Sequence, residues 1–480
     1  MWIYVDVGGN GMAGRRYARL KSPVRRTRGP LALFSAALAP SLLIAVPAAA
    51  APATGAGTVL AKSAASKAGT AKDDLLAQLR AVPGLRVVSV KKGRAKGYKD
   101  YTLTFTQPVD HRNPRGGTFQ QRLTLSHRSV DRPVVLYTSG YLMPEKVWLQ
   151  EPTYGLDANQ LSVEHRFFGT SLPKRKDWAK LDIWQEASDE HAIVEALKQV
   201  YGGAWIGTGA SKGGMTAVYH HRFYPGDLDG VVAYVAPNDA VNDDDRVYER
   251  FFTTVGTPSC RAALRIVQRE ALKRRKSLVP RLTAMARREG LTFRRTIGTA
   301  DRSFELSVLD SAWTFWQYFR QQDCKGIPGE KASDAAIFRW VDKIQTWEEY
   351  TDQGIEPYLP YYYQAATQLG WASLSFAHLK GLTRYPGLYQ PNSVLPASLR
   401  SRFDGRAMRD VDAWVTRQAS RMMFVYGGRD PWSAERFTPK GTDCHVYVAP
   451  RANHGASISH LSSRDFAEAT DTLRRWARLT

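Results

Sequence analysis

Residues 209–213 have the sequence Gly-Ala-Ser-Lys-Gly, which matches the G-x-S-x-G pattern around a nucleophilic serine. A short apolar run precedes this segment and a run with helical spacing follows it, so Ser211 is predicted to lie on a turn between a strand and a helix. On such a turn the hydroxyl projects above the sheet, and the flanking glycines avoid clashes between Cβ atoms and the backbone. The pattern therefore predicts that Ser211 attacks a carbonyl carbon.

A nucleophilic serine needs a general base and an acid that orients the base, and both residue types follow in the chain. Asp430 comes after the apolar run 421–426, and His454 comes after the apolar run 444–448. The order serine, acid, histidine, with each residue after a strand, is typical of α/β-hydrolases. We therefore predict a catalytic triad in which His454 takes the proton of Ser211 and Asp430 orients the imidazole.

The same chemistry requires donors for the negatively charged oxygen of the intermediate. The backbone N–H of Lys212 is the first expected donor, because it opens the helix after the nucleophile. A second N–H is expected from the loop after the apolar run 132–138, near Gly140 and Tyr141.

A parallel sheet is needed to position these residues. Short apolar runs alternate with runs of helical spacing up to residue 240 and again from residue 406, which predicts a mostly parallel sheet with helices on both faces, the α/β-hydrolase fold. Residues 241–405 have helical spacing and many aromatic side chains, so we predict a helical cap inserted between two parts of the core, 73–240 and 406–480. The strands are predicted at 101–106, 119–127, 132–138, 160–164, 204–207, 230–236, 421–426 and 444–448. The core helices are predicted at 74–80, 188–200, 211–223, 406–418 and 463–478.

The N-terminus predicts export. Seven basic residues precede an apolar run at 31–46 and four alanines at 48–51, so residues 1–50 are predicted to be a secretory signal peptide and 51–72 a flexible leader. An uncleaved membrane anchor is the alternative.

Sixty-seven Lys and Arg against 45 Asp and Glu give a net charge of +22, but the basic residues are spread along the chain. We therefore expect a secreted, extracellular monomer without nucleic-acid binding or stable membrane association.

Three cysteines remain after the predicted signal. Export to an oxidising compartment favours one disulfide and one free thiol, and Cys260–Cys324 is the favoured pair because both residues lie in the middle segment. The two pairings with Cys444 stay open. The sequence has no CxxC, HExxH or Cys/His cluster, so we expect no metal site and no cofactor.

Two further segments indicate a family. Residues 107–111 are Gln-Pro-Val-Asp-His, and residues 164–173 are Glu-His-Arg-Phe-Phe-Gly-Thr-Ser-Leu-Pro. With residues 209–214 they resemble the secreted and lysosomal proline-specific serine exopeptidases, the Pro-Xaa carboxypeptidase and dipeptidyl peptidase group. Lys212 stands where that group usually has tyrosine, and Gly-Ala-Ser-Lys-Gly-Gly-Met is closer to the streptomycete tripeptidyl aminopeptidases.

This resemblance covers the chain from about residue 75 to its end. It implies an α/β-hydrolase core with a helical cap, and the release of tripeptides from a free N-terminus with proline preferred at the cleaved position. A Pro-Xaa-type carboxypeptidase, or a lipase or carboxylesterase with the same triad, stays open as an alternative.

The two exopeptidase polarities need opposite charges near the triad. An aminopeptidase needs a carboxylate for the substrate ammonium group, whereas a carboxypeptidase needs a cation, for which Arg166 is a candidate. Trp316 and Tyr361 are candidates for a proline pocket. The acids expected as candidates for the ammonium group are Glu164, Glu348, Glu349 and Glu356.

Overall fold

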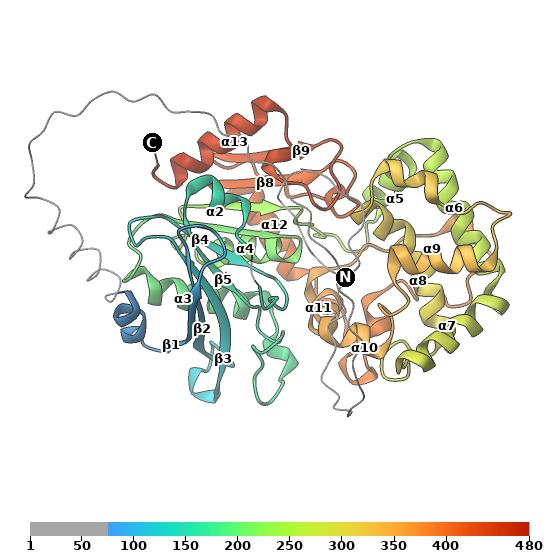
Figure 1. Ribbon diagram of the computed structural model, residues 1–480, viewed down its shortest axis with the longest axis horizontal. Helices are drawn as coiled ribbons and strands as arrows, with labels where there is room; N and C mark the ends of the chain where they lie inside the picture. The colour runs from blue at the N-terminus through green and yellow to red at the C-terminus, as the bar shows by residue number, and fades with distance from the viewer. Residues whose placement is uncertain (1–74, 147, 480) are drawn as a thin grey trace, which may run out of the picture. The chain divides into compact units, whose positions relative to one another are not determined.

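The computed structural model describes residues 75–146 and 148–479 (Figure 1). The predicted signal peptide at 1–50 and leader at 51–72 lie outside the described residues. Residues from Leu75 onward belong to one compact unit.

The strands of the described chain form one nine-stranded sheet with the order β1-β2-β3-β5-β4-β6-β7-β8-β9. The first three strands pair antiparallel, and β3 also pairs antiparallel with β5, whereas every pair from β5 to β9 is parallel. The expected α/β-hydrolase class is therefore confirmed. The strands are β1 Leu85–Lys92, β2 Lys99–Pro108, β3 Thr118–His127, β4 Val134–Thr138, β5 Asn159–Val163, β6 Trp205–Ala210, β7 Gly230–Tyr234, β8 Met422–Gly427 and β9 Cys444–Ala449.

Helices cover both faces of this sheet. One face packs against α3, α4 and α12 in a single hydrophobic cluster, and the other packs against α2 and α13. The central strands β6, β7 and β8 are buried almost throughout, as expected for parallel strands covered on both sides. The core helices are α2 Glu151–Leu156, α3 Ile183–Lys198, α4 Lys212–Phe223, α12 Arg406–Arg417 and α13 Ser463–Trp476.

The chain between β7 and β8 is helical, as the aromatic-rich segment predicted. It has its own hydrophobic cluster, which also takes in Tyr141 and Phe168 from the core. Figure 1 shows these helices beside one end of the sheet. They are α5 Arg246–Thr254, α6 Pro258–Lys273, α7 Arg275–Glu289, α8 Ala300–Tyr318, α9 Asp334–Gln345, α10 Asp352–Ile355 and α11 Leu359–Gln364.

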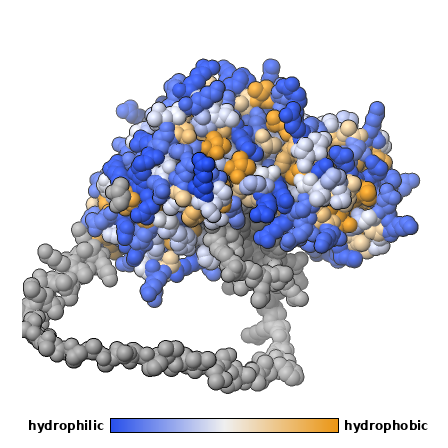
Figure 2. All heavy atoms as spheres, turned by 90° about the horizontal axis from the view of Figure 1, so that it is seen from above, coloured by the Kyte–Doolittle hydropathy of each residue, from blue (hydrophilic) through white to orange (hydrophobic). Residues whose placement is uncertain are grey.

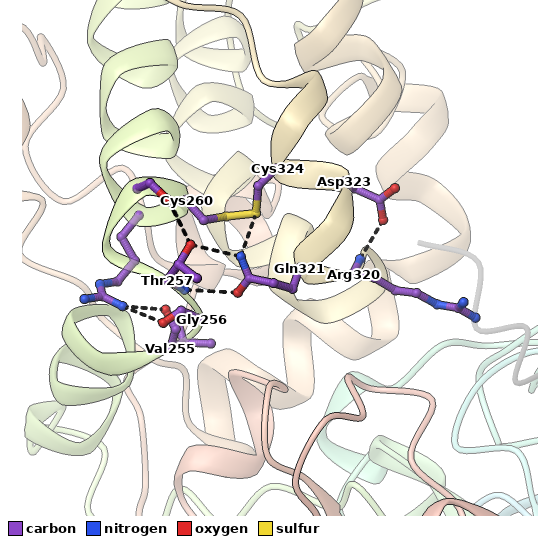
Figure 3. Close-up of a disulfide and its surroundings, with 10 residues drawn as sticks. Val255, Gly256, Thr257, Cys260, Arg320, Gln321, Asp323 and Cys324 are labelled. Carbon is purple, nitrogen blue, oxygen red and sulfur yellow. Dashed lines mark hydrogen bonds between the residues drawn. A yellow bond between two sulfur atoms is a disulfide. The ribbon is translucent and has the colours of Figure 1, made fainter.

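A disulfide joins Cys260 at the start of α6 to Cys324 in the turn after α8 (Figure 3). The side chain of Gln321 supports it, because it accepts a hydrogen bond from the Thr257 N–H and donates one to the Thr257 hydroxyl, at 3.0 and 3.1 Å. Cys444, at the start of β9, is a half-buried free thiol.

The surface seen in Figure 2 is mainly hydrophilic, with apolar residues in small separate groups. Within residues 75–146 and 148–479, no helix combines the length and the apolar character needed to cross a bilayer.

Candidate active site

Ser211 lies on the sharp turn between β6 and α4 with φ 56° and ψ −129°, in the left-handed region that a nucleophile elbow uses. The glycines make this turn sterically feasible. A Cβ on Gly209 would lie 2.3 Å from the Gly213 carbonyl oxygen, and one on Gly213 would lie 2.4 Å from the Thr138 carbonyl oxygen. The Ser211 N–H donates to the Tyr234 carbonyl at 2.8 Å, which fixes the turn to β7. The local sequence thus places a serine hydroxyl at the carboxyl ends of the parallel strands.

The structure brings His454 and Asp430 together on the loops after β9 and β8. His454 Nδ1 lies 2.8 Å from Asp430 Oδ2, and both side chains are buried. The carboxylate also accepts bonds from the Ser433 hydroxyl at 2.6 Å and the Trp432 N–H at 3.2 Å. A carboxylate only accepts, so Nδ1 carries the imidazole proton and Nε2 is left as the basic nitrogen. Within the described chain, Nε2 has no hydrogen-bond partner.

The cap holds the histidine loop in place. The backbone N–H of His454 donates to the carbonyl of Gln317 in α8 at 3.1 Å. The ring of Tyr318 stands edge-on to the imidazole at 6.3 Å. The position of the general base therefore depends on the inserted helices as well as on the sheet.

Tyr141 meets the nucleophile with its side chain and not with its backbone. Its N–H donates to the Ser139 hydroxyl at 3.3 Å, so that N–H is already engaged. Burial raises the pKa of the Tyr141 hydroxyl well above its usual value, and a hydrogen bond with the Ser211 side chain partly offsets this. The Tyr141 backbone N–H is therefore not free to act as the expected second donor, and the assignment of Tyr141 to the oxyanion hole stays a prediction. The N–H of Lys212, as the first residue of α4, has no acceptor within the helix.

The side chain of Lys212 is buried beneath the nucleophile. Its Nζ lies 3.7 Å from Glu186 Oε1 and 5.8 Å from the ring centroids of Tyr141 and Phe168. Burial lowers the pKa of Lys212 to about 8. The other oxygen of Glu186 lies 2.5 Å from His165 Nε2, so the ammonium belongs to a buried ionic group. The sequence analysis did not predict this group, because its members lie on three separate segments and no local pattern joins them.

Glu164 is not available to a substrate, which corrects the expectation for this residue. It is buried and accepts hydrogen bonds from the backbone of Met143, Thr170 and Ser171 and from the hydroxyls of the last two. Arg122 lies 3.6 Å from it as a further partner. Glu164 therefore holds the loop after β5 in place.

The family-like segments 107–111 and 164–173 meet around Asp189 of α3. Arg166 donates to both carboxylate oxygens of Asp189 at 2.7 and 2.8 Å, and His111 Nε2 lies 2.7 Å from one of them. Arg166 is buried and also donates to backbone carbonyls. It is therefore not available as an anchor for a substrate carboxylate.

The three acids expected from the cap lie in different surroundings. Glu356 is exposed and pairs with Arg295 at 2.9 Å, and Glu348 is exposed. Glu349 is half-buried, and its charge contributes to the raised pKa of Tyr318, whose ring contacts that of His454, and of Tyr358, whose ring contacts that of Tyr141. Of these three, Glu349 has the electrostatic link to the site.

The two aromatic candidates for a proline pocket also differ. Trp316 is buried in the cap cluster and packs against Gly256, so it is a core residue. The ring of Tyr361 lies 5.5 Å from that of Tyr141 and 6.2 Å from that of Trp371. Tyr361 therefore borders the site.

Comparison with known proteins gives similarity over the whole described region. The family model PS-10 peptidase S37 matches residues 64–480. A prolyl tri/tetrapeptidyl aminopeptidase from Streptomyces mobaraensis is 47% identical over 429 residues, which cover 88% of this chain and 89% of that protein. A solved proline iminopeptidase from Mycobacterium smegmatis has a TM-score of 0.37 and 11% identity, covering 78% of this chain and 99% of that one. Carboxyl esterase 2 from the fungus Tuber melanosporum has a TM-score of 0.35 and 9% identity, covering 86% and 97%.

Proposed function

Since the chain belongs to the peptidase S37 family, it is a peptidase, and we propose that it is a secreted serine aminopeptidase that releases tripeptides from a free N-terminus, with proline preferred at the cleaved position. The observation that carries the substrate class is the 47% identity, over most of both chains, to the prolyl tri/tetrapeptidyl aminopeptidase. The signal-like N-terminus supports secretion. We further infer that it acts on peptides as a monomer, without nucleic acid, cofactor or stable membrane association.

Ser211, His454 and Asp430 supply the chemistry. His454 Nε2 takes the hydroxyl proton while Ser211 Oγ bonds to the carbonyl carbon, and the same nitrogen then gives the proton to the departing amine as the C–N bond breaks. Water attacks the resulting acyl-enzyme with the same proton transfers and releases the tripeptide. Asp430 stabilises the imidazolium formed in each half of the reaction. The Lys212 N–H and the Tyr141 hydroxyl stabilise the oxyanion.

The amino-terminal polarity is supported by the pairing of Arg166. A carboxypeptidase would need a free cation, and Arg166 is held by Asp189 in a bidentate pair. The assignment of Glu349 as a contact for the substrate ammonium group remains a prediction.

The test is a paired assay with the purified protein. A chromogenic tripeptide ending in proline, with a free N-terminus, is compared with its N-acetylated form and with a short-chain acyl ester. We expect rapid hydrolysis of the free peptide and a large loss on acetylation. Ser211→Ala, with an unchanged melting temperature, is expected to lower turnover by about 10⁴-fold or more. Hydrolysis of the ester alone would replace the peptidase proposal with an esterase.

A further inference from the structure

Buried polar atoms without partners gather beside the acid loop of the triad. Among the described residues, Asp239 Oδ2, Glu435 Oε2 and the indole N–H groups of Trp313 and Trp371 take part in no hydrogen bond. Asp239 is 6% exposed and Trp313 is 3% exposed. Because native structures rarely leave buried polar atoms unpaired, such a concentration points to a bound group.

The two acids come from neighbouring strand ends. Asp239 follows β7, and Glu435 follows β8 on the loop that carries Asp430. The N–H of Asn238 donates to the Glu435 carbonyl at 3.4 Å, which holds the two segments side by side. Burial raises the pKa of Glu435 to about 8 and that of Asp239 to about 7, and the charge of Asp239 contributes to the shift of Glu435. A cation bound beside these carboxyl groups would favour their ionised forms.

Other acids of this segment already have structural roles. Asp245 accepts the Ser373 N–H at 2.7 Å, and Glu249 accepts the Ser375 N–H at 2.6 Å, so both hold the cap chain. Asp244 is exposed to solvent and paired with Arg246 at 2.5 Å. Asp239 and Glu435 differ from these acids in that each has a buried carboxylate oxygen without a hydrogen bond.

Aromatic rings surround the acid pair. Trp432 lies 4.7 Å from Trp313 and 5.8 Å from Trp371, measured between ring centroids. Tyr248 packs against Trp313 at 5.5 Å between ring centroids. Such walls suit an organic ammonium group, which rings attract through their π faces, better than a metal ion that needs six or more oxygen ligands.

A chain of aromatic ring contacts leads from Tyr141, beside the nucleophile, to the segment next to Asp239. Tyr361 links the two places, with ring contacts of 5.5 Å to Tyr141 and 6.2 Å to Trp371. Gly370, next to Trp371, packs against Asp239 so closely that a Cβ would lie 2.4 Å from Oδ2.

We propose that Asp239 and Glu435 together bind the α-ammonium group of the substrate and so set the length of the released peptide. This assignment rests on the proposed aminopeptidase function, and it places the amine at the acid pair in preference to Glu349.

The test uses Asp239→Asn and Glu435→Gln, which keep the shape of each side chain. For both variants we expect kcat/KM on the free tripeptide to fall about 10- to 100-fold, while the slow hydrolysis of the acetylated peptide stays unchanged. Asp244→Asn is the matched control, and it should behave as the wild type on both substrates. Glu349→Gln is measured alongside as the competing assignment.

The outcomes separate the two proposals. A wild type that hydrolyses free and acetylated tripeptides equally would refute the aminopeptidase function itself. Suppose instead that the wild type prefers the free peptide. If folded Asp239→Asn and Glu435→Gln keep this preference, or if only Glu349→Gln loses it, the acid-pair assignment alone would be overturned. If one acid-pair variant fails to fold, the other, from a different segment, decides the question.

Discussion

At the residue scale, the proposed oxyanion donors depend on which atom of a predicted residue faces the nucleophile. The G-x-S-x-G segment and the loop after β4 predicted two backbone donors, at Lys212 and Tyr141. The turn at Gly140, with φ 69°, directs the Tyr141 N–H to the Ser139 hydroxyl and leaves the phenol toward Ser211. Hydrogen bonding within such a turn depends on contacts that no local motif contains.

The substitution Tyr141→Phe tests whether the Tyr141 hydroxyl stabilises the oxyanion. Removing one oxyanion donor costs about 100-fold in kcat, because the interaction is made in the transition state, and KM should change little. Steady-state kinetics on the free tripeptide measure both constants. Tyr201→Phe, which removes another buried hydroxyl, one that pairs with His127, is the control and should keep full kcat. An unchanged kcat in Tyr141→Phe would leave the backbone groups as the oxyanion donors.

The triad and the ammonium site differ in how far the sequence could predict them. Ser211, Asp430 and His454 each follow an apolar run, so local patterns alone predict that they meet at one sheet edge. Glu164 also follows a strand, but a loop folded over it takes up its oxygens. Asp239 becomes a candidate only when the cap chain at Gly370 is known to pack against it.

At the element scale, the parallel strands were predictable, whereas the start of α3, the short helix α2 and the strand β1 were not. β4 to β9 lie within a few residues of the apolar runs, because buried strands need continuous apolar side chains. The helix expected at 188–200 begins at Ile183, since the Asp182 side chain accepts the Gln185 N–H and the first turns bury polar residues. β1, Leu85–Lys92, was not predicted, because an edge strand with exposed Val88 and Val90 lacks a clean alternation.

The packing of α3 against α4 makes the free energy of unfolding depend on pH. His220 Nε2 lies 2.7 Å from Asp227 Oδ2, and its Nδ1 lies 3.3 Å from Glu190 Oε2. Burial lowers the pKa of His220, but these two acids outweigh burial and raise it from 6.5 to about 9. A raised histidine pKa stabilises the fold fully below pH 6.5, and this contribution is lost as the pH rises through 9.

We therefore expect His220→Gln to flatten the decline in stability between pH 6.5 and 9. Across this range the free energy of unfolding should fall by up to about 3 kcal/mol more in the wild type than in the variant. Urea unfolding at several pH values measures this difference. His221→Gln is the matched control, because burial lowers the pKa of His221 to about 4 and leaves it neutral throughout the range. Equal pH dependence in wild type and His220→Gln would show that His220 is not charged in the folded protein.

At the scale of the whole molecule, two hydrophobic cores share one active site. The sheet and its helices place the nucleophile and the acid, whereas α8 of the cap holds the backbone of His454 through Gln317. Tyr141 and Phe168 extend from the sheet side into the cap cluster. We therefore expect order in the cap to be needed for catalysis.

The disulfide Cys260–Cys324 allows this dependence to be tested, because it joins α6 to the turn directly after α8. Its removal by a Cys260→Ser/Cys324→Ser double substitution frees a loop with a sequence separation of 64 and should cost about 4 kcal/mol of cap stability. We expect the melting temperature to fall by several degrees. We also expect kcat for the free tripeptide to fall at temperatures where the sheet core is still folded, because the cap helices that contact the His454 loop unfold first. Cys444→Ser, at the free thiol of β9, should leave both quantities unchanged. The contrary outcome is a double variant that is less stable but keeps its kcat until the whole chain unfolds. The sheet alone would then position the His454 loop, and the contact with Gln317 would have no part in catalysis.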